Sequence, residues 1–268
     1  MRTVSSRQNP LVHTFRELAD HPDPTGERVL LDGVHLIRDA HAAGALFEVV
    51  AVAASRLNAA GSDEGTLAQE LESAQADVVV AGDKVFAALS PVKSPSGLVA
   101  IARRHVSAPA LICGHPRAFV VAAVDVQDPG NVGSLLRAAE AGGATGAFVC
   151  GTSANPFSWK ALRGSMGSAL RLPIVAGMTP DAVIACARSA GVRLVAAVPR
   201  EGDAPDEIDW RGPTALLVGG EGPGLSDDVL AAADARVSIP MAATVDSLNV
   251  AVAGGILIYA ARRQRIAV

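Results

Sequence analysis

The sequence lacks the patterns that usually indicate a metal site or a disulfide framework. Its 268 residues include only 3 cysteines, and no two of them form a Cys-x-x-Cys pair. The 6 histidines show no metal-ligand spacing. We therefore expect reduced, buried thiols in a cytoplasmic protein that binds no metal ion.

Long hydrophobic runs are missing as well. Residues 1–18 contain no apolar stretch long enough for a secretory signal peptide. The most apolar segment, residues 250–261, is shorter than the roughly 20 residues that span a bilayer, and Asp246 and Asn249 stand just before it. We expect a buried helix here and no association with a membrane.

The chain also lacks the positive net charge that nucleic-acid-binding proteins usually carry, because its formal net charge is −4. This total is a weak test, since phosphate contacts depend on where lysine and arginine lie. Taken one at a time, most of these lysine and arginine side chains are typical of the solvated faces of helices. They occur in three groups along the chain: Arg7, Arg16, Arg28, Arg38, Arg56, Arg103 and Arg104; Lys160, Arg163 and Arg171; and Arg262, Arg263 and Arg265.

The length and the 50% hydrophobic content are sufficient for two α/β domains. Apolar strands alternate with helical stretches in the first part, which predicts a small domain at residues 1–105. Two prolines and a glycine then interrupt the pattern, and we assign residues 106–117 as a linker. The strands expected in the first domain are 28–32, 47–54, 77–81 and 98–103, and the helices are 11–19, 34–43, 64–74 and 83–88.

The alternation resumes in residues 118–268. Continuous apolar strands between helices predict a parallel sheet that is covered on both faces. The expected strands are 119–124, 146–150, 172–175, 193–198, 215–218 and 235–239, and the expected helices are 132–141, 158–166, 181–190, 227–233 and 245–263.

Three of these strands are followed by segments rich in glycine or amide residues. The segments are Phe119–Gly143, Thr214–Ser226 and Val237–Arg263. Ligands bind at the carboxyl edge of an open α/β sheet, because strand ends and helix N-termini converge there. We therefore expect the three segments to form one site.

The first two segments offer mainly backbone groups. Asp128–Ser134 opens a helix whose free N–H groups favour an anion or a ribose hydroxyl, with Arg137 within reach of a phosphate. Gly219–Gly224 is so rich in glycine that its backbone must approach something closely or adopt positive φ repeatedly. Glu221 in this loop is placed to pair with a cation or to order a neighbouring backbone. The dinucleotide-binding GxGxxG pattern and the P-loop are absent.

The third segment places Ser247–Asn249 at the start of the apolar helix, with Asp246 or Ser247 as the expected N-cap. Each segment alone is explained by a capped helix or an ordinary strand-to-helix loop. Three such segments in matched positions favour a shared site over three independent explanations.

The motifs NVGSLLRAAEAGG, LLVGGEGPGLS and IPMAATVDSLNVAVAGGILIYAA, in this order, resemble motifs 1, 2 and 3 of the SpoU (TrmH) family of the SPOUT superfamily. The segment ALRGSMGSALRLP between motifs 1 and 2 is similar to the family as well. The resemblance covers residues 119–263, and the first domain more loosely resembles the family's substrate-binding domain.

This resemblance implies a parallel-sheet α/β domain with a deep trefoil knot, a small N-terminal α/β domain that binds substrate, and S-adenosylmethionine as the cofactor. The implied cofactor-binding residues are Val218, Gly219, Ile239, Met241 and Leu248. The implied catalytic residues are Asn131, Arg137, Glu221, Ser247 and Asn249.

The implied activity is methylation of a ribose 2′-hydroxyl in RNA by a homodimer, with Arg137 near the partner's cofactor pocket. We expect ribosomal RNA (rRNA) as the substrate in preference to tRNA. Methyl transfer needs positioning and a route for the hydroxyl proton, which suits motifs that contain no histidine or cysteine. A tRNA methyltransferase, a non-catalytic RNA-binding member of the fold and a different α/β nucleotide transferase remain alternatives.

Overall fold

A computed structural model describes residues 1–266, so the last two residues of the predicted second domain lie outside the described residues. Contacts divide the chain into two units. The first combines Met1–His105 with Phe157–Arg171, and the second combines Val106–Pro156 with the described residues from Leu172 onward. No helix within residues 1–266 is long and apolar enough to cross a membrane.

The division differs from the sequence-based one in residues 157–171, which the sequence places in the second domain. The ring of Phe157 explains part of this difference, because it fills the space beside Gly26 and lies 3.6 Å from the guanidinium carbon of Arg104. Arg171 also forms an ion pair of 3.0 Å with Asp39. These contacts all lie within the first unit.

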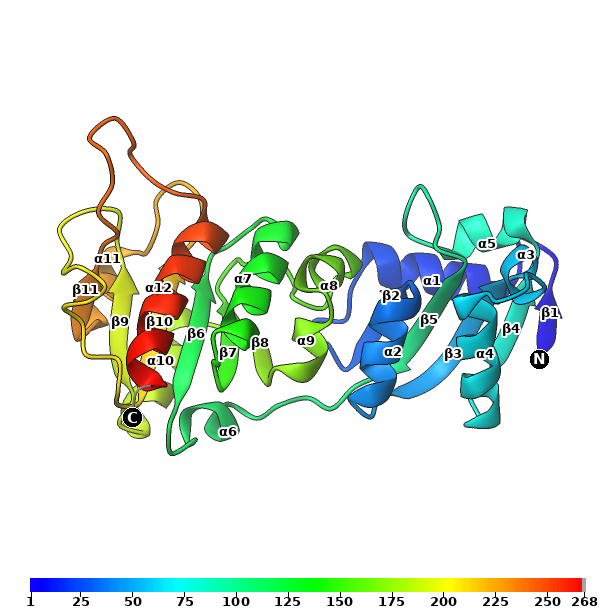
Figure 1. Ribbon diagram of the computed structural model, residues 1–268, viewed down its shortest axis with the longest axis horizontal. Helices are drawn as coiled ribbons and strands as arrows, with labels where there is room; N and C mark the ends of the chain where they lie inside the picture. The colour runs from blue at the N-terminus through cyan, green and yellow to red at the C-terminus, as the bar shows by residue number, and fades with distance from the viewer. Residues whose placement is uncertain (267–268) are drawn as a thin grey trace. The chain divides into compact units, whose positions relative to one another are not determined.

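The second unit is built on a six-stranded parallel sheet with the order β11-β9-β10-β6-β7-β8 (Figure 1). The parallel arrangement confirms the prediction from the continuous apolar strands. The strands are β6 (Phe119–Val124), β7 (Gly146–Cys150), β8 (Ile174–Met178), β9 (Arg193–Ala197), β10 (Thr214–Gly219) and β11 (Ala235–Val237), and the helices are α6 (Pro109–Cys113), α7 (Pro129–Ala141), α10 (Pro180–Ser189), α11 (Asp227–Ala232) and α12 (Val250–Arg265).

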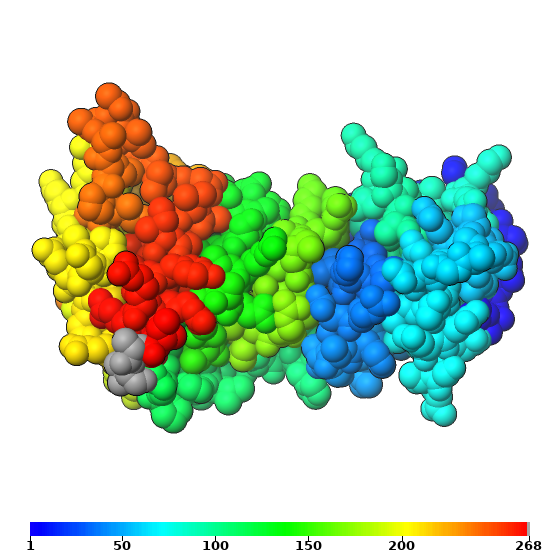
Figure 2. Space-filling view, viewed as in Figure 1, coloured from blue at the N-terminus to red at the C-terminus, as the bar shows by residue number. Residues whose placement is uncertain are grey.

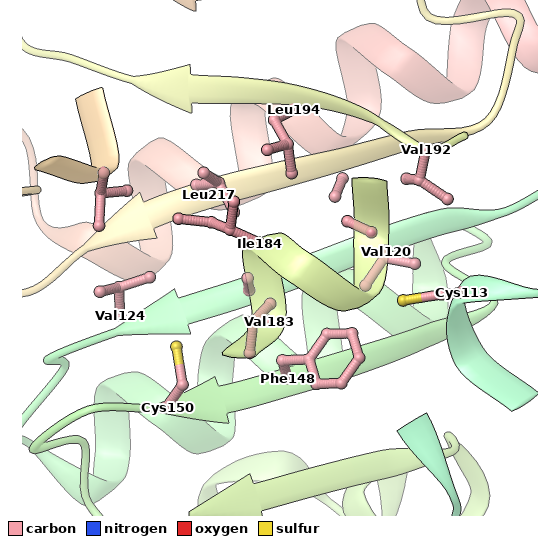
Figure 3. Close-up of a cluster of buried hydrophobic side chains, with 14 of the residues drawn as sticks. Cys113, Val120, Val124, Phe148, Cys150, Val183, Ile184, Val192, Leu194 and Leu217 are labelled. Carbon is pink, nitrogen blue, oxygen red and sulfur yellow. The ribbon is translucent and has the colours of Figure 1, made fainter. Parts of the chain in front are cut away.

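Both faces of this sheet are covered by helices. Alternate residues of β6, such as Val120 and Val124, join the cluster formed with α6, α10 and α11. Figure 3 shows part of this cluster, with Val183 and Ile184 of α10 among the strand residues. Helices α7 and α12 lie side by side over the opposite face (Figure 1). Burial on both sides explains why β6 reads as a continuous apolar run.

Glycine lets α7 and α12 pack closely. A Cβ atom added at Gly254 of α12 would lie 2.3 Å from Cδ1 of Leu135 in α7. A Cβ atom added at Gly142, at the end of α7, would lie 2.0 Å from Cγ2 of Ile258. A larger side chain at either position must displace Leu135 or Ile258 from its present place between the helices.

The first unit contains a mixed five-stranded sheet with the order β1-β4-β3-β5-β2, in which β5 runs antiparallel to both of its neighbours. Its core lies between these strands and helices α1 and α5. The strands are β1 (Arg2–Val4), β2 (Arg28–Asp32), β3 (Leu46–Ala53), β4 (Val78–Ala81) and β5 (Leu98–Arg103), and the helices are α1 (Pro10–Asp20), α2 (Val34–Ala42), α3 (Ala54–Leu57), α4 (Asp63–Ser73), α5 (Asp83–Leu89), α8 (Trp159–Ser165) and α9 (Ser168–Arg171).

Some elements differ from the expectations. Strand β1 and helices α3 and α6 were not predicted, because they have only three to five residues and show no full period. The predicted start of the last helix at residue 245 is wrong, since α12 begins at Val250 and residues 245–249 form a loop. The apolar period of the helix extends into that loop, and the capping side chain alone marks the true boundary.

Arg265 holds the end of α12 against the sheet. Its guanidinium donates to the carbonyl oxygens of Trp210, Gly212, Arg117 and Ala118, at 2.5–3.3 Å. Partial burial and, to a smaller extent, the charge of Arg117 lower the pKa of Arg265. Four carbonyl acceptors compensate for this burial, and no carboxylate of the described residues pairs with Arg265.

We predict that Arg265→Ala lowers the free energy of unfolding by about 2 kcal/mol, because it leaves the carbonyl oxygens without their charged donor. Arg265→Lys should recover little of the lost free energy of unfolding, since one ammonium group cannot reproduce the planar arrangement of donors on a guanidinium. Arg263→Ala is the control, because Arg263 is an exposed arginine of the same helix. Chemical denaturation of the three variants tests this, and equal stability of Arg265→Ala and Arg263→Ala would contradict it.

Candidate active site

The carboxyl ends of β6 and β10 deliver the first two predicted segments to one place. The two strands are parallel neighbours, with Gly219 in register with Val124. The isolated pairing of Gly220 with Gly224 closes the glycine-rich loop into a tight turn. The third segment follows β11 and leads into α12. The expected convergence of the three segments is therefore confirmed.

The turn after β6 is fixed by two aspartates. Asp125 adopts a left-handed conformation with φ 56°, and its carboxylate accepts hydrogen bonds from the backbone N–H and the hydroxyl of Thr152. Asp128 caps α7 by accepting from the N–H of Asn131 at 2.8 Å. Pro129 follows at the first helical position, where its fixed φ suits the helix. Together these residues orient the first turn of α7 and the side chain of Asn131.

Gly219, the last residue of β10, and Gly220, which follows it, are required by close backbone approach. A Cβ atom at Gly219 would lie 2.5 Å from backbone atoms of Gly224 and Leu225. At Gly220 it would lie 1.8 Å from the carbonyl oxygen of Asp125. Further along the loop, Gly222 and Gly224 adopt positive φ of 95° and 72°. Both predicted reasons for the glycine content are thus confirmed.

A chain of side-chain hydrogen bonds joins all three motifs. The Nδ2 group of Asn249 donates to Oδ1 of Asn131 at 3.0 Å, and the Nδ2 group of Asn131 donates to Oε1 of Glu221. The other oxygen of Glu221 accepts from the backbone N–H of Gln127 at 3.3 Å. Glu221 therefore orders a neighbouring backbone, which is one of its two predicted roles.

The donor and acceptor chemistry of the side chains fixes the direction in which these hydrogen bonds run. A carboxylate only accepts, so Asn131 must present its NH₂ group to Glu221 and its oxygen to Asn249. The oxygen of Asn249 is already engaged, because it accepts from the N–H groups of Ala251 and Val252 at the start of α12. Asn249 is therefore the N-cap of α12, and the predicted cap at Asp246 or Ser247 is wrong. Asp246 instead accepts from Arg200 at 3.4 Å.

A cavity of about 370 Å³ opens beside these hydrogen-bonded side chains. All five residues predicted to bind a cofactor line it: Val218, Gly219, Ile239, Met241 and Leu248. Three of the predicted catalytic residues line it too: Glu221, Ser247 and Asn249. Asn131 reaches the site through its hydrogen bonds to Glu221 and Asn249.

Arg137 is the predicted site residue that the structure does not bring to this cavity. It lies on the exposed side of α7, two turns after the start of the helix, and is absent from the described residues that line the cavity. Arg137 therefore does not contribute to the lining of the pocket of its own chain.

Sequence reasoning missed a third wall of the cavity, formed by Ala197, Val198 and Pro199. Ala197 is the last residue of β9, and Val198 and Pro199 follow it. Strand β9 pairs with β10 and ends at the same edge of the sheet. The predicted strand over residues 193–198 already places these residues at a strand end. That strand end has no glycine or amide residue that would suggest a binding site. Val250, Ala253 and Leu257 of α12 complete the apolar lining.

The lining suits a ligand held by backbone groups and apolar contacts. Glu221 is the one ionisable side chain among the described residues that line the cavity. Within the described part of the chain, no cluster of three or more histidine, cysteine, aspartate or glutamate side chains could hold a metal ion. The model of the SpoU rRNA Methylase family matches residues 118–259, which include the whole site.

The chain belongs to the SpoU methylase family. This membership confirms the family and the enzyme class, a methyltransferase, that the three motifs predicted. The matched segment covers the sheet of the second unit and all three loops.

Relatives of similar length support the assignment over the full chain. An uncharacterised tRNA/rRNA methyltransferase of Synechocystis sp. is 34% identical over 98% of this chain and 94% of its own. The 23S rRNA (guanosine(2553)-2′-O)-methyltransferase RlmP of Bacillus subtilis is 27% identical over 97% of this chain and 98% of its own. The crystal structure of an AdoMet-bound rRNA methyltransferase from Sinorhizobium meliloti is 31% identical, with a TM-score of 0.85, and the match covers 98% of this chain and 97% of that one.

We predict that Gly219→Val abolishes the binding of S-adenosylmethionine, because the added Cβ collides with the backbone of Gly224 and Leu225 and displaces the wall of the cavity. Isothermal titration calorimetry measures the loss. Gly212→Val is the matched control, since a Cβ atom at Gly212 meets no atom within 4 Å. Both variants are checked for the native circular dichroism spectrum, and unchanged affinity in Gly219→Val would contradict the assignment of the pocket.

Proposed function

We propose that this SpoU-family enzyme transfers the methyl group of S-adenosylmethionine to a ribose 2′-hydroxyl of rRNA in the cytoplasm. The observation that carries the proposal is the hydrogen-bond chain from Asn249 through Asn131 to Glu221, which joins all three motifs at the edge of the cavity. The Bacillus subtilis relative is named as a 2′-O-methyltransferase of 23S rRNA, and this supports both the reaction and the substrate.

The cavity fits the proposed cofactor. Gly219 and Gly220 bring bare backbone to its wall, where any Cβ atom would collide with neighbouring backbone atoms. Ile239, Met241 and Leu248 supply apolar surface. When bound, S-adenosylmethionine supplies an activated methyl group, so the protein needs no nucleophile of its own.

The polar residues of the motifs then act on the ribose. Asn131 is held between Glu221 and Asn249, two residues that line the cavity, and its amide group is fixed by these hydrogen bonds. Ser247 lies on the exposed loop that lines the other side. Arg137 supplies a positive charge that binds the substrate phosphate and polarises the hydroxyl, but it does not take the proton, because guanidinium stays protonated in proteins.

The proposal is tested by incubating the purified protein with labelled S-adenosylmethionine and either rRNA or tRNA. Methylation of the 2′-hydroxyl protects the adjacent phosphodiester from alkaline hydrolysis, so a labelled, alkali-resistant dinucleotide from rRNA is the expected product. Label in tRNA alone would identify the tRNA alternative. RNA binding without transfer would support the non-catalytic alternative, and label on a base would contradict ribose methylation.

We predict that Arg137→Ala lowers kcat on the order of 100-fold or more, because its contacts form mainly in the transition state. The affinity for S-adenosylmethionine, measured by calorimetry, should stay nearly unchanged. Arg137→Lys should not restore activity if the phosphate contact is bidentate. Methylation at the wild-type rate by Arg137→Ala would remove the assignment.

The enzyme is proposed to act as a homodimer through α12. Val252, Ile256 and Tyr259 follow one another at helical spacing and are 53%, 43% and 50% exposed. Figure 2 shows this helix (red) open on the visible face, next to α7 (green), which carries Arg137. A second copy that covers this apolar stripe would bury it and bring Arg137 toward the partner's cavity.

We predict that Ile256→Glu converts the dimer into a monomer in sedimentation experiments at micromolar concentration, because it buries a charge in the proposed interface. Leu46→Glu is the control, since Leu46 is a more exposed apolar residue of the first unit. Mixing the inactive variants Arg137→Ala and Gly219→Val should restore activity if Arg137 serves the partner's pocket. A wild-type protein that sediments only as a monomer would contradict the dimer.

Most arginines of the first unit are engaged within the protein. Arg28 and Arg103 form ion pairs with Glu48 at 2.7 and 2.8 Å. Burial lowers the pKa of Arg104 to about 10, although the charge of Asp23 partly opposes this shift. These residues therefore have little capacity left for RNA phosphates.

Arg56 and Arg163 are the arginines that line an open cavity of about 640 Å³ in the first unit. The guanidinium group of neither residue forms a hydrogen bond or an ion pair with another described residue. The charge of Arg163 acts on Asp32, and Asp63 and Glu64 lie on the same lining. We assign these two arginines to RNA contacts in the substrate-binding domain.

We predict that the double change Arg56→Ala and Arg163→Ala weakens RNA binding and makes the salt dependence shallower, by about 0.9 in slope for each phosphate that the protein no longer neutralises. Arg103→Ala removes a charge that is already paired and should change the slope less. Filter binding over a range of salt concentrations measures the RNA affinity and its salt dependence for each variant. Equal slopes for the double variant and Arg103→Ala would contradict the assignment.

The predicted trefoil knot belongs to the same proposal. Strand β10 lies between β9 and β6, although β7 and β8 intervene between β6 and β9 along the chain. The loop before α12 adjoins the glycine-rich loop after β10 in the lining of one cavity. This order and this adjacency support a C-terminal segment threaded through a preceding loop.

A further inference from the structure

The reaction proposed above uses no cysteine, but two of the three thiols lie together in the second unit. The Sγ atom of Cys186 in α10 is 2.9 Å from the Sγ atom of Cys113, the last residue of α6. Cys186 also lies 3.6 Å from the carbonyl oxygen of Pro109 at the start of α6. The separation of the two sulfur atoms exceeds a disulfide bond of about 2.05 Å by less than 1 Å.

The two thiols differ in their exposure. Cys113 is 3% exposed and belongs to the core cluster drawn in Figure 3, whereas Cys186 packs at the edge of that cluster and is half-buried. A reagent in solution therefore meets Cys186 first. Cys113 lies behind it, at a distance from which it can attack the same sulfur.

We propose that Cys113 and Cys186 are a modification site that forms a reversible disulfide with low-molecular-weight disulfides as the oxidant. The Cys186 thiolate attacks the oxidant, and one small thiolate leaves. The Cys113 thiolate then attacks Sγ of Cys186, the bond to the second small thiol breaks, and a second thiolate leaves. The two protons lost by the cysteines end on the two small thiols, so the oxidant takes up both electrons.

The bond would tie α6 to α10 across a separation of 73 residues. Helix α6 is the first element of the second unit and leads directly into β6. A cross-link over such a long loop restricts the unfolded chain and stabilises the unit that carries the cofactor cavity. Neither cysteine lines that cavity, so the bond would form outside it.

Cys150 is a built-in control. It is 1% exposed, and its Sγ atom lies 3.5 Å from the carbonyl oxygen of Ala123. Burial, with a smaller contribution from the charge of Asp125, raises the pKa of Cys150 to about 12. Burial and the contact with Cys186 raise the pKa of Cys113 to about 12 as well, so the difference between the two thiols is the neighbouring Sγ atom. Cys150 has no thiol partner within the described chain, so it should stay reduced under the same treatment.

The experiment treats the full-length native protein with oxidised glutathione and maps the peptides by mass spectrometry without reduction. The expected result is a linked peptide pair that contains Cys113 and Cys186 and is lighter by two hydrogen atoms, while Cys150 remains free for alkylation after denaturation. Oxidation should raise Tm by roughly 5 °C, and dithiothreitol should reverse the shift.

Two variants separate this bond from a general effect of oxidation. Cys150→Ser should show the same linked peptides and the same rise in Tm as the wild type. Cys186→Ser, changed at the half-buried position so that the core stays intact, should show neither. A glutathione adduct that persists on Cys186 without closure, or no linked pair after oxidation of the native protein, would overturn the proposal. Both readouts are independent of methyl transfer and of RNA.

Discussion

The site depends on one side chain, Asn131, which bridges Glu221 and Asn249 and so joins loops that are far apart in the sequence. This bridge forms only because β6 and β10 are parallel neighbours whose carboxyl ends meet at one edge of the sheet. The aspartate cap and proline at the start of α7 then fix the direction of the amide. The same contact also positions α12, because Asn249 uses its oxygen as the helix cap and its NH₂ group for Asn131.

The cavity beside this bridge explains why the motifs contain so little conventional catalytic chemistry. Its walls are mainly backbone and apolar side chains, and Glu221, the one ionisable group among the described lining residues, already accepts two hydrogen bonds. Such a pocket recognises shape and backbone complementarity, whereas a cofactor that carries its own reactive group supplies the driving force. The exposed position of Arg137 leaves its guanidinium accessible to solvent, as the proposed contact with an RNA phosphate requires.

Much of this site could be predicted from the sequence, because glycine and capping residues state local requirements that do not depend on distant parts of the chain. Gly219 and Gly222 illustrate the two requirements, close approach and positive φ. The N-cap of α12 could not be chosen among Asp246, Ser247 and Asn249, since all three residue types cap helices well. The wall from Ala197 to Pro199 carries no polar signal, and the grouping of residues 157–171 with the first unit depends on tertiary contacts of Phe157.

The most direct test of the central claim is a crystal structure of the protein grown with S-adenosylmethionine. We predict density for the cofactor in the cavity between Gly219, Ile239 and Leu248, with its polar atoms on backbone groups and the hydrogen bonds from Asn249 through Asn131 to Glu221 intact beside it. Density for the cofactor at another place on the protein, with this cavity empty, would contradict the account.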